Sequence, residues 1–383
     1  MSLTVSVRQR AALVAAADLK RRLVDFAMTA PYERHLRQQL RDLQSSSHSE
    51  EDRTVMAVEA LLFEFEYDDG SSILDRFLAR QQRLTPQERG LIDRWGDSVF
   101  GVFEIRDRLE DVLLIHNLLD ELDYLALSTM GAESILPLTP ASFLVTRLLP
   151  VEEVWLLSGI QVVLPPDARD EVAQAVREQA LNQPSLVLRN PVKLAKAREM
   201  TEAFHDSFLD CFGTDRVVVP AHDAVAVYHR FLDHHEQRLA QPGHEWGSAR
   251  GDALTGGWDA QFTGYATVAI WHRRDTGVWF LGDFQLVHDA FVDPSETPDP
   301  VSLDTLRNYL QDDTIPPWVI EELRAEFPEV ADHTMALGLG KPDFDWQADG
   351  ERLMRKQKPT FYQRYGGLPN TVPLPAFAQE IHE

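Results

Sequence analysis

The sequence has little cysteine, no excess of positive charge and no uninterrupted apolar run. Cys211 is the only cysteine in 383 residues, which excludes a disulfide framework and a multi-cysteine zinc site. The 37 basic residues are outnumbered by 61 acidic ones, and the resulting net charge of −24 argues against a broad phosphate-binding surface. The most apolar stretch, 143–164, contains an arginine, a proline and two glutamates, so it is too interrupted to span a bilayer.

Several patterns that mark enzymes and transported proteins are also missing. The sequence contains no glycine-rich dinucleotide loop, no phosphate-loop lysine, no Gly-x-Ser-x-Gly and no His-Glu-x-x-His. Residues 343–350 resemble a calcium loop, but the glycine falls two places late and the closing glutamate is absent. Near the start, the apolar run 11–17 is interrupted at once by Asp18 and by three basic residues that follow, unlike a secretory core. We therefore expect a cytoplasmic protein without a membrane segment.

The length and composition predict an α+β multidomain protein. With 44% hydrophobic and 26% charged residues, 383 residues fit two to four globular domains. Residues 1–98 predict a helical domain, because apolar residues recur there every three or four positions. Ser71 is the expected cap of one helix, and residues 85–88, Thr-Pro-Gln-Glu, form a capping box for another.

Residues 99–165 predict a small β-barrel or sandwich. Five or six short apolar runs follow one another there, and residues 150–153 have the pattern of a tight hairpin. Small barrels often bind oligonucleotides, but residues 101–150 carry eight acidic and only three basic groups. The segment also lacks an aromatic stripe on which bases could stack. Nucleic-acid binding by this segment alone is therefore disfavoured.

The remaining sequence predicts a helical connector at 166–242 and a mixed α+β domain at 243–383. Six of the twenty glycines fall within 243–264, which predicts a linker or a partly mobile loop. The following strand, 265–271, is apolar on both faces and is therefore expected to be central in its sheet, with 278–281 as its hairpin partner.

One helix between 222 and 239 offers a possible divalent-metal site. Imidazole and carboxylate groups follow one face of this helix at steps of seven, four and three residues: His222, His229, Asp233 and Glu236. Apolar residues occupy the opposite face, so we expect this stripe to face solvent without a metal. His235 lies among the apolar residues and is expected to be a hydrogen-bonded core histidine, and Cys211 an inert, buried thiol.

Two groups of residues are candidates for binding a partner. Trp246 and Trp258 place large apolar surface in the glycine-rich segment, which a purely flexible linker would not need. A short basic run near the C-terminus could contact a nucleic acid, since it contains no acidic residue and is followed by aromatic ones; its residues are Arg352, Arg355, Lys356 and Lys358. A solvated helix end is the competing interpretation of this run.

Several motifs resemble those of a group of uncharacterised bacterial proteins, some of which end in an SEC-C zinc motif. They are the segment from Leu84 to Ile105, the strand–turn–strand of 144–159, Thr-Ile-Pro-Pro-Trp at 314–318, and Gly-Lys-Pro-Asp-Phe-Asp-Trp at 340–346. The resemblance covers roughly residues 50–360, and none of its motifs is catalytic. The zinc-binding cysteines are absent here, so the zinc and the contacts implied by that motif are not carried over.

These observations favour a non-enzymatic binding or adaptor protein without a cofactor, whose partner is another protein. One alternative is a metal-dependent hydrolase or nuclease that uses the histidine- and aspartate-rich region 205–236 with a divalent metal ion. The other is nucleic-acid binding through local basic surface, since the first 50 residues carry eight basic and five acidic groups.

Overall fold

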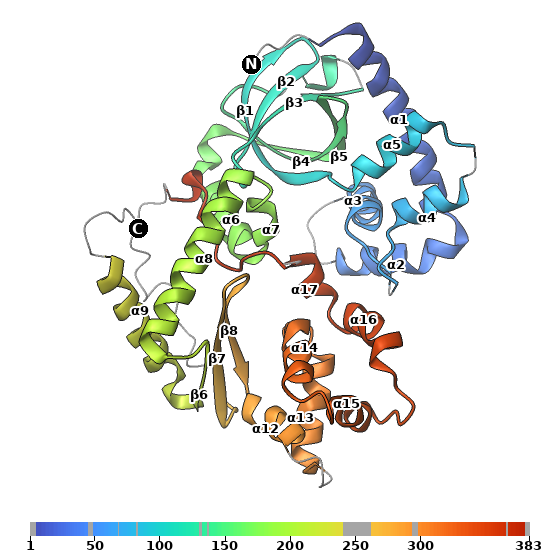
Figure 1. Ribbon diagram of the computed structural model, residues 1–383. Helices are drawn as coiled ribbons and strands as arrows, with labels where there is room; N and C mark the ends of the chain where they lie inside the picture. Colours follow the sequence, from blue (N-terminus) through green and yellow to red (C-terminus); the bar gives the residue numbers. More distant parts are fainter. Residues whose placement is uncertain are drawn as a thin grey trace. The chain divides into compact units, whose positions relative to one another are not determined.

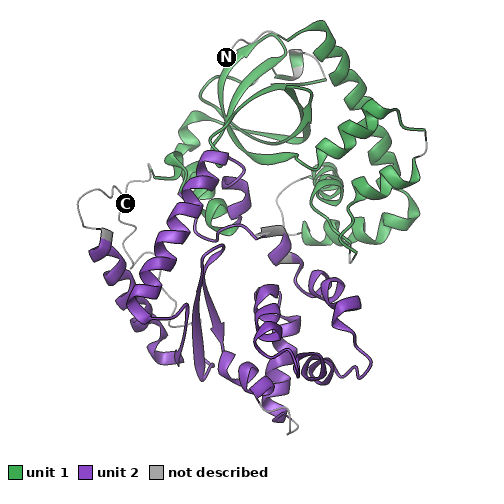
Figure 2. Cartoon of the chain, in the orientation of Figure 1, with its two compact units in different colours: residues 1–182, 374–383 green, residues 183–373 purple. Residues whose placement is uncertain are grey.

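The computed structural model describes most of the chain and divides it into two compact units (Figure 2). The described residues are 5–44, 49–67, 69–81, 83–129, 132–135, 138–239, 262–292, 298–364 and 367–379. Unit 1 comprises Met1–Asn182 and Leu374–Glu383, and unit 2 comprises Gln183–Pro373. The α+β class predicted from the sequence is confirmed. Among the described residues, no helix combines the length and apolarity needed to cross a membrane.

Unit 1 begins with a group of helices. They are α1 (Val7–Ala27), the short 3₁₀ helix η1 (Ala30–Tyr32), α2 (Glu33–Asp42), α3 (Glu50–Phe63), α4 (Ile73–Arg80) and α5 (Pro86–Trp95). Of these, α1, α3, α4 and α5 start at a side-chain cap. The predicted capping box at Thr85 is confirmed, because its hydroxyl accepts from the Glu88 amide. The predicted cap at Ser71 is wrong by one residue: Ser72 caps α4, while the Ser71 hydroxyl donates to Asp69.

The strands of unit 1 follow directly, within the range that the sequence predicts. They are β1 (Val99–Leu109), β2 (Val112–Asn117), β3 (Asp123–Leu127), β4 (Phe143–Val151) and β5 (Val154–Leu164), with the 3₁₀ helix η2 (Ala132–Ile135) before β4. The strand order is β1-β2-β3-β5-β4 and closes on itself, because β1 pairs with both β2 and β4. Only the β3–β5 pair is parallel. The predicted hairpin at 150–153 joins β4 to β5, with Glu152 in a left-handed conformation.

One apolar core joins the helices of unit 1 to its strands (Figure 1). It contains Leu19 and Leu23 of α1, Leu61 of α3 and Trp95 of α5, together with Leu149 and other residues of the sheet. The predicted segments 1–98 and 99–165 therefore share one core, and the strands have a second apolar cluster of their own that includes Phe103 and Leu144. Unit 1 is completed by η3 (Pro166–Ala168), by α6 (Arg169–Asn182) and by a final 3₁₀ helix, η5 (Ala376–Gln379), which contacts α6.

Unit 2 is built on a three-stranded antiparallel sheet in the order β6-β7-β8. Its strands are β6 (Arg216–Pro220), β7 (Thr267–Arg273) and β8 (Gly277–Gly282). The helices before β7 are α7 (Pro184–Val187), α8 (Pro191–Phe212), η4 (Ala221–Asp223) and α9 (Ala224–Leu239). Those after β8 are α12 (Phe284–Val292), α13 (Pro300–Gln311), α14 (Pro317–Glu326), α15 (Ala331–Leu339), α16 (Trp346–Gln357) and α17 (Pro359–Arg364).

The sheet of unit 2 is covered on both faces, as predicted for its central strand β7. Ile270 packs on one face with Phe208 of α8 and Phe231 of α9. Ala269 and Trp271 pack on the other face with residues of α12 to α16, and Figure 1 shows these two helical layers on opposite sides of the sheet. The predicted connector 166–242 is distributed between the units, since α6 belongs to unit 1 and α7 to α9 belong to unit 2.

Candidate functional site

The two tryptophans proposed as binding residues, Trp246 and Trp258, lie outside the described residues. The same holds for the glycine-rich segment 243–264 up to residue 261. Its proposed role as a loop that orders on binding stays a prediction. Phe262, at the end of this segment, is described and is buried beside β7 and β8.

Three of the proposed metal residues lie on α9, but His222 lies before it in η4, so the prediction of one helix that carries all four is wrong. His222, Asp233 and Glu236 are exposed and His229 is half-buried. His222 lies beside the adjacent Asp223, with 3.6 Å between Nε2 and Oδ2. Within the described parts of the chain, no group of three or more histidine, cysteine, aspartate or glutamate side chains is placed to hold a metal ion.

The C-terminal basic run is largely paired with acidic residues of its own helix. Arg352 lies 2.5 Å from Asp349, and Arg355 lies 3.1 Å from Glu351, one turn earlier in α16. Lys356 is exposed. Exposed pairs of this kind contribute little stability, but they reduce the positive potential available to a phosphate.

The prediction that Lys358 belongs to a basic surface is wrong. Its side chain is fully buried, and its ammonium group donates to the backbone oxygens of Tyr309 (2.6 Å) and Asp312 (2.7 Å). Burial lowers the pKa of Lys358 to about 8. The residue therefore satisfies the last carbonyls of α13, a role that its place in a basic run did not indicate.

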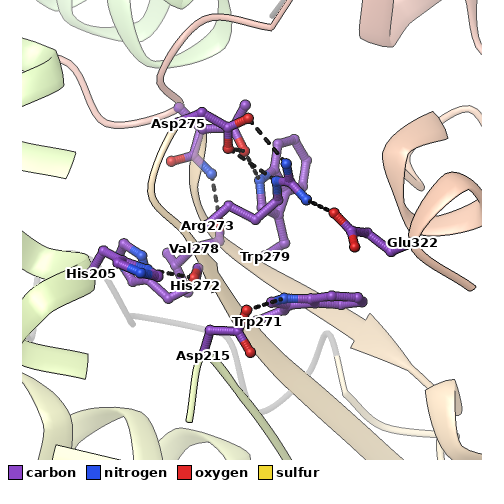
Figure 3. Close-up of polar contacts among 11 residues, drawn as sticks. His205, Asp215, Trp271, His272, Arg273, Asp275, Val278, Trp279 and Glu322 are labelled. Atoms are coloured by element: carbon purple, nitrogen blue, oxygen red, sulfur yellow. Dashed lines mark hydrogen bonds and ion pairs between the residues drawn. The ribbon is translucent and has the colours of Figure 1, made fainter. Parts of the chain in front are cut away.

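A polar cluster surrounds the β7–β8 hairpin (Figure 3). Arg273 of β7 contacts both Asp275 oxygens, with distances of 3.0 and 3.1 Å, and its third contact is Glu322 of α14 at 2.5 Å. The Trp271 indole donates to Asp215 at 3.4 Å. These contacts join the hairpin to the strand before it and to α14. Arg273 is paired with two carboxylates, those of Asp275 and Glu322, and these contacts form a structural network.

Three buried histidines lie on the opposite face of the same hairpin. His205 Nδ1 donates to the His272 carbonyl at 2.8 Å, and His235 Nδ1 bonds the Ser207 hydroxyl at 2.9 Å. His272 is buried, and its Nδ1 has no partner. The His235 ring stacks on Phe204, with 4.0 Å between ring centroids. The prediction that His235 is a hydrogen-bonded core residue is confirmed, and Cys211 packs half-buried against the neighbouring apolar cluster.

A second buried polar network lies in unit 1, between the helices and the closed sheet. Lys20 of α1 contacts Glu59 of α3 at 2.6 Å and donates to the Ser158 hydroxyl of β5 at 2.5 Å. Arg147 of β4 pairs with Glu59 at 3.5 Å and also with Glu64. A serine beside a lysine can act as a nucleophile and base. Here Ser158 is buried and Lys20 is neutralised by Glu59, so the network serves to fix the helices on the sheet.

The described residues of unit 2 enclose a cavity of about 670 Å³. It lies between the ends of β7 and β8 and helix α13. Three aromatic rings line it, those of Phe262, Tyr265 and Phe280. Its polar lining comes from Asp283, from α13 and from the turn that follows α13: Thr305, Asn308, Tyr309, Gln311, Asp312 and Thr314.

The walls of this cavity are held in place by close contacts. The Tyr265 ring lies against Gly282, where a Cβ atom would come within 2.6 Å of the ring carbons. Tyr309 donates its hydroxyl to the Gly282 carbonyl at 2.6 Å. Asp283 has a left-handed backbone (φ +52°), which is strained for a residue with a side chain. Its carboxylate offsets this strain by accepting from the Ala266 amide at 2.7 Å and the Thr267 amide at 3.2 Å.

Sequence reasoning did not find this cavity. Its residues come from two stretches, 262–283 and 305–315, and each is ordinary by itself: a hairpin end and a helix end. The signal that the sequence offers is a pair of aspartates at turns: Asp283 follows β8 and Asp312 follows α13.

Comparison with known proteins covers part of unit 1. Residues 19–185, less than half of the chain, match a family described as a family of unknown function (DUF7986). A search of curated proteins and a search of solved structures each found no match. The buried network around Lys20, Glu59 and Arg147 lies inside the matched range, whereas the cavity lies outside it. The resemblance to proteins that carry an SEC-C motif stays a prediction.

Proposed function

We propose that this chain is a non-enzymatic binding protein and that the cavity of unit 2 is its binding site. The observation that carries the proposal is the cavity itself, a concave site lined by aromatic rings with a small number of polar groups. Its volume of about 670 Å³ is in the range of cavities that hold a small ligand or an inserted side chain.

The lining supports binding better than catalysis. Among the described residues that line it there is no histidine, cysteine, lysine or arginine. General acid–base and nucleophilic catalysis at neutral pH usually depend on such groups, held within hydrogen-bond reach of one another. The fixed walls are suited to recognition, because little ordering is needed when a ligand enters.

The other predictions from the sequence belong to the same proposal. A protein partner fits a site that accepts an inserted side chain, and a cytoplasmic location is part of the proposal. The metal-dependent hydrolase and the nucleic-acid-binding protein stay as alternatives without a specific observation in their favour.

A neutral aromatic dye, N-phenylnaphthylamine, tests whether the cavity binds ligands. We expect a saturable rise in its fluorescence with the full-length protein, and loss of that rise in Thr305→Trp, which fills the cavity from α13. Thr54→Trp is the matched control, because both hydroxyls donate to the carbonyl four residues earlier and Thr54 is not in the lining.

A second filling variant, Asn308→Trp, is available should Thr305→Trp unfold, since Asn308 is exposed at the rim. The proposal fails if the wild-type protein binds no dye. It also fails if folded variants with a filled cavity bind the dye as well as the wild type does.

A further inference from the structure

Most of the hydroxyl groups that line the cavity already donate within the protein, and the other side-chain donors of the lining are the amides of Asn308 and Gln311, which are exposed at its rim. The Tyr309 hydroxyl donates to the Gly282 carbonyl, the Thr305 hydroxyl to the Val301 carbonyl at 2.8 Å, and the Thr314 hydroxyl to Asp312 at 2.7 Å. These three are all the hydroxyl groups of the lining apart from that of Tyr265, which stands at the exposed rim. A ligand that needs hydrogen-bond donors from the protein would find few here.

Acceptors, in contrast, remain available. Asp283 uses Oδ1 for two backbone amides, and Asp312 uses Oδ1 for the amide and hydroxyl of Thr314. Among the described residues, the second oxygen of each carboxylate has no partner. Each carboxylate is thus oriented by its own loop while one oxygen is left for a ligand.

The charge of the lining has one sign. Asp283 and Asp312 are its only charged residues among those described. Lys358 is fully buried, and its ammonium group donates to the Tyr309 and Asp312 carbonyls; it also attracts the Asp312 carboxylate and offsets part of that negative charge. The whole chain carries a net charge of −24, which adds a long-range attraction for cations.

The aromatic walls complete a site for a positively charged group. Phe262 and Phe280 pack against each other, with 5.6 Å between ring centroids, and form one wall, while the Tyr265 ring is held against Gly282 at the rim. The face of an aromatic ring attracts ammonium and guanidinium groups, and it does so more strongly when water is partly excluded. Carboxylates beside aromatic rings therefore select for charge and for apolar surface together.

We infer that the ligand of this cavity carries an ammonium or guanidinium group, which the carboxylates of Asp283 and Asp312 bind between the aromatic walls. This inference rests on the proposed function, because it names the chemistry of the same site. Such a group occurs in free polyamines and in the lysine or arginine side chains of a protein partner.

Displacement of N-phenylnaphthylamine at low ionic strength tests the inference. Spermidine represents a free polyamine, and acetyl-arginine amide represents an arginine side chain within a polypeptide. Octanediol and glutarate are the neutral and anionic controls. We expect at least one of the two cations to displace the dye and both controls to fail, and the stronger of the two cations identifies the source of the group.

A charge-neutral variant gives the second measurement. Asp283→Asn combined with Asp312→Asn keeps an oxygen for the backbone amides but removes both charges. We expect the affinity for the cation, measured relative to the variant's own affinity for the dye, to fall about tenfold or more. The control is Asp299→Asn combined with Asp345→Asn, because both residues also accept from backbone amides at helix starts in unit 2 and neither lines the cavity.

The outcomes separate the two proposals. If the dye binds but neither cation displaces it, or if the cavity and control variants respond alike, the inference about charge is overturned and the binding site stands. Displacement by octanediol as strong as that by spermidine also overturns it. If the dye does not bind at all, the proposed function fails as well.

Discussion

Two histidines beside β7 should make unit 2 unstable in mild acid. Burial lowers the pKa of His235 to about 4, with Arg238 and His234 adding like charge. Burial also lowers the pKa of His272 to about 3, with His205 and His235 acting in the same direction. In an unfolded chain both pKa values return to about 6.5.

The sign of the effect follows from proton binding. Both groups are neutral in either state well above pH 6.5, so the folded state loses nothing there. As the pH falls below 6.5, the unfolded chain takes up protons that the folded state does not, and the free energy of unfolding decreases. The loss continues until the pH reaches the folded pKa values.

The loss of unfolding free energy at pH 5 follows from the difference between that pH and the pKa of the unfolded chain. Each histidine should cost about 2 kcal/mol there relative to pH 7, and the two together about 4 kcal/mol. That is a large share of the stability of an ordinary domain. The His272 Nδ1 has no hydrogen-bond partner among the described residues, and a backbone hydrogen bond with Arg273 offsets only part of the effect of burial on the pKa of His272.

Urea unfolding, followed by hydrogen exchange of β7 and β8 between pH 7 and pH 5, measures the effect within unit 2. The double variant His235→Asn with His272→Gln removes both ionisable groups, and asparagine retains a polar atom for Ser207. We expect this variant to lose about 4 kcal/mol less than the wild type between the two pH values. The exposed His222→Gln is the control and should behave as the wild type. Equal losses in the double variant and the wild type would refute the reasoning.

Two further predictions concern single residues. Lys358→Met should destabilise unit 2 by about 1–3 kcal/mol, because it leaves the Tyr309 and Asp312 carbonyls without a donor. Lys356 is exposed, so the control Lys356→Met should change stability by less than about 0.5 kcal/mol in the same urea titration. Gly159→Ala should cost more than Gly213→Ala, since both glycines have left-handed backbones (φ +69° and +73°) but a Cβ at Gly159 would lie 3.0 Å from Glu59 and one at Gly213 would meet nothing within 4 Å. Thermal melts of the two variants check this difference, and equal melting temperatures would show that Glu59 can move aside at no cost.

Features set by neighbouring residues could be predicted from the sequence. The Thr85 capping box depends on four consecutive residues, and the strands of 99–164 show their period directly. The central position of β7 was visible because both of its faces are apolar. In each case the cause lies within the segment that shows the effect.

Features set by distant residues could not be predicted. In the sequence, residues 217–220 only separate two helical patterns, yet they belong to β6, whose partner β7 lies some fifty residues later. Lys358 belongs to a basic run in the sequence, but its side chain is buried because it binds the carbonyls at the C-terminal end of α13. The cavity forms only where the stretches 262–283 and 305–315 meet in the fold. The sequence therefore does not show that Asp283 and Asp312 line the same site.

The position of η5 bears on how the protein is made. Phe377 of η5 packs against Phe143 of β4, with 5.6 Å between ring centroids, and lies under the Arg169 guanidinium at 4.5 Å. A ribosome produces these last residues of unit 1 only after it has produced the whole of unit 2. Unit 2 can therefore complete its fold first, although domains usually fold in the order of synthesis. Until η5 has been synthesised, Phe143 and Arg169 lack their contact with Phe377. The surface around Phe143 therefore stays exposed on the growing chain until synthesis is nearly finished.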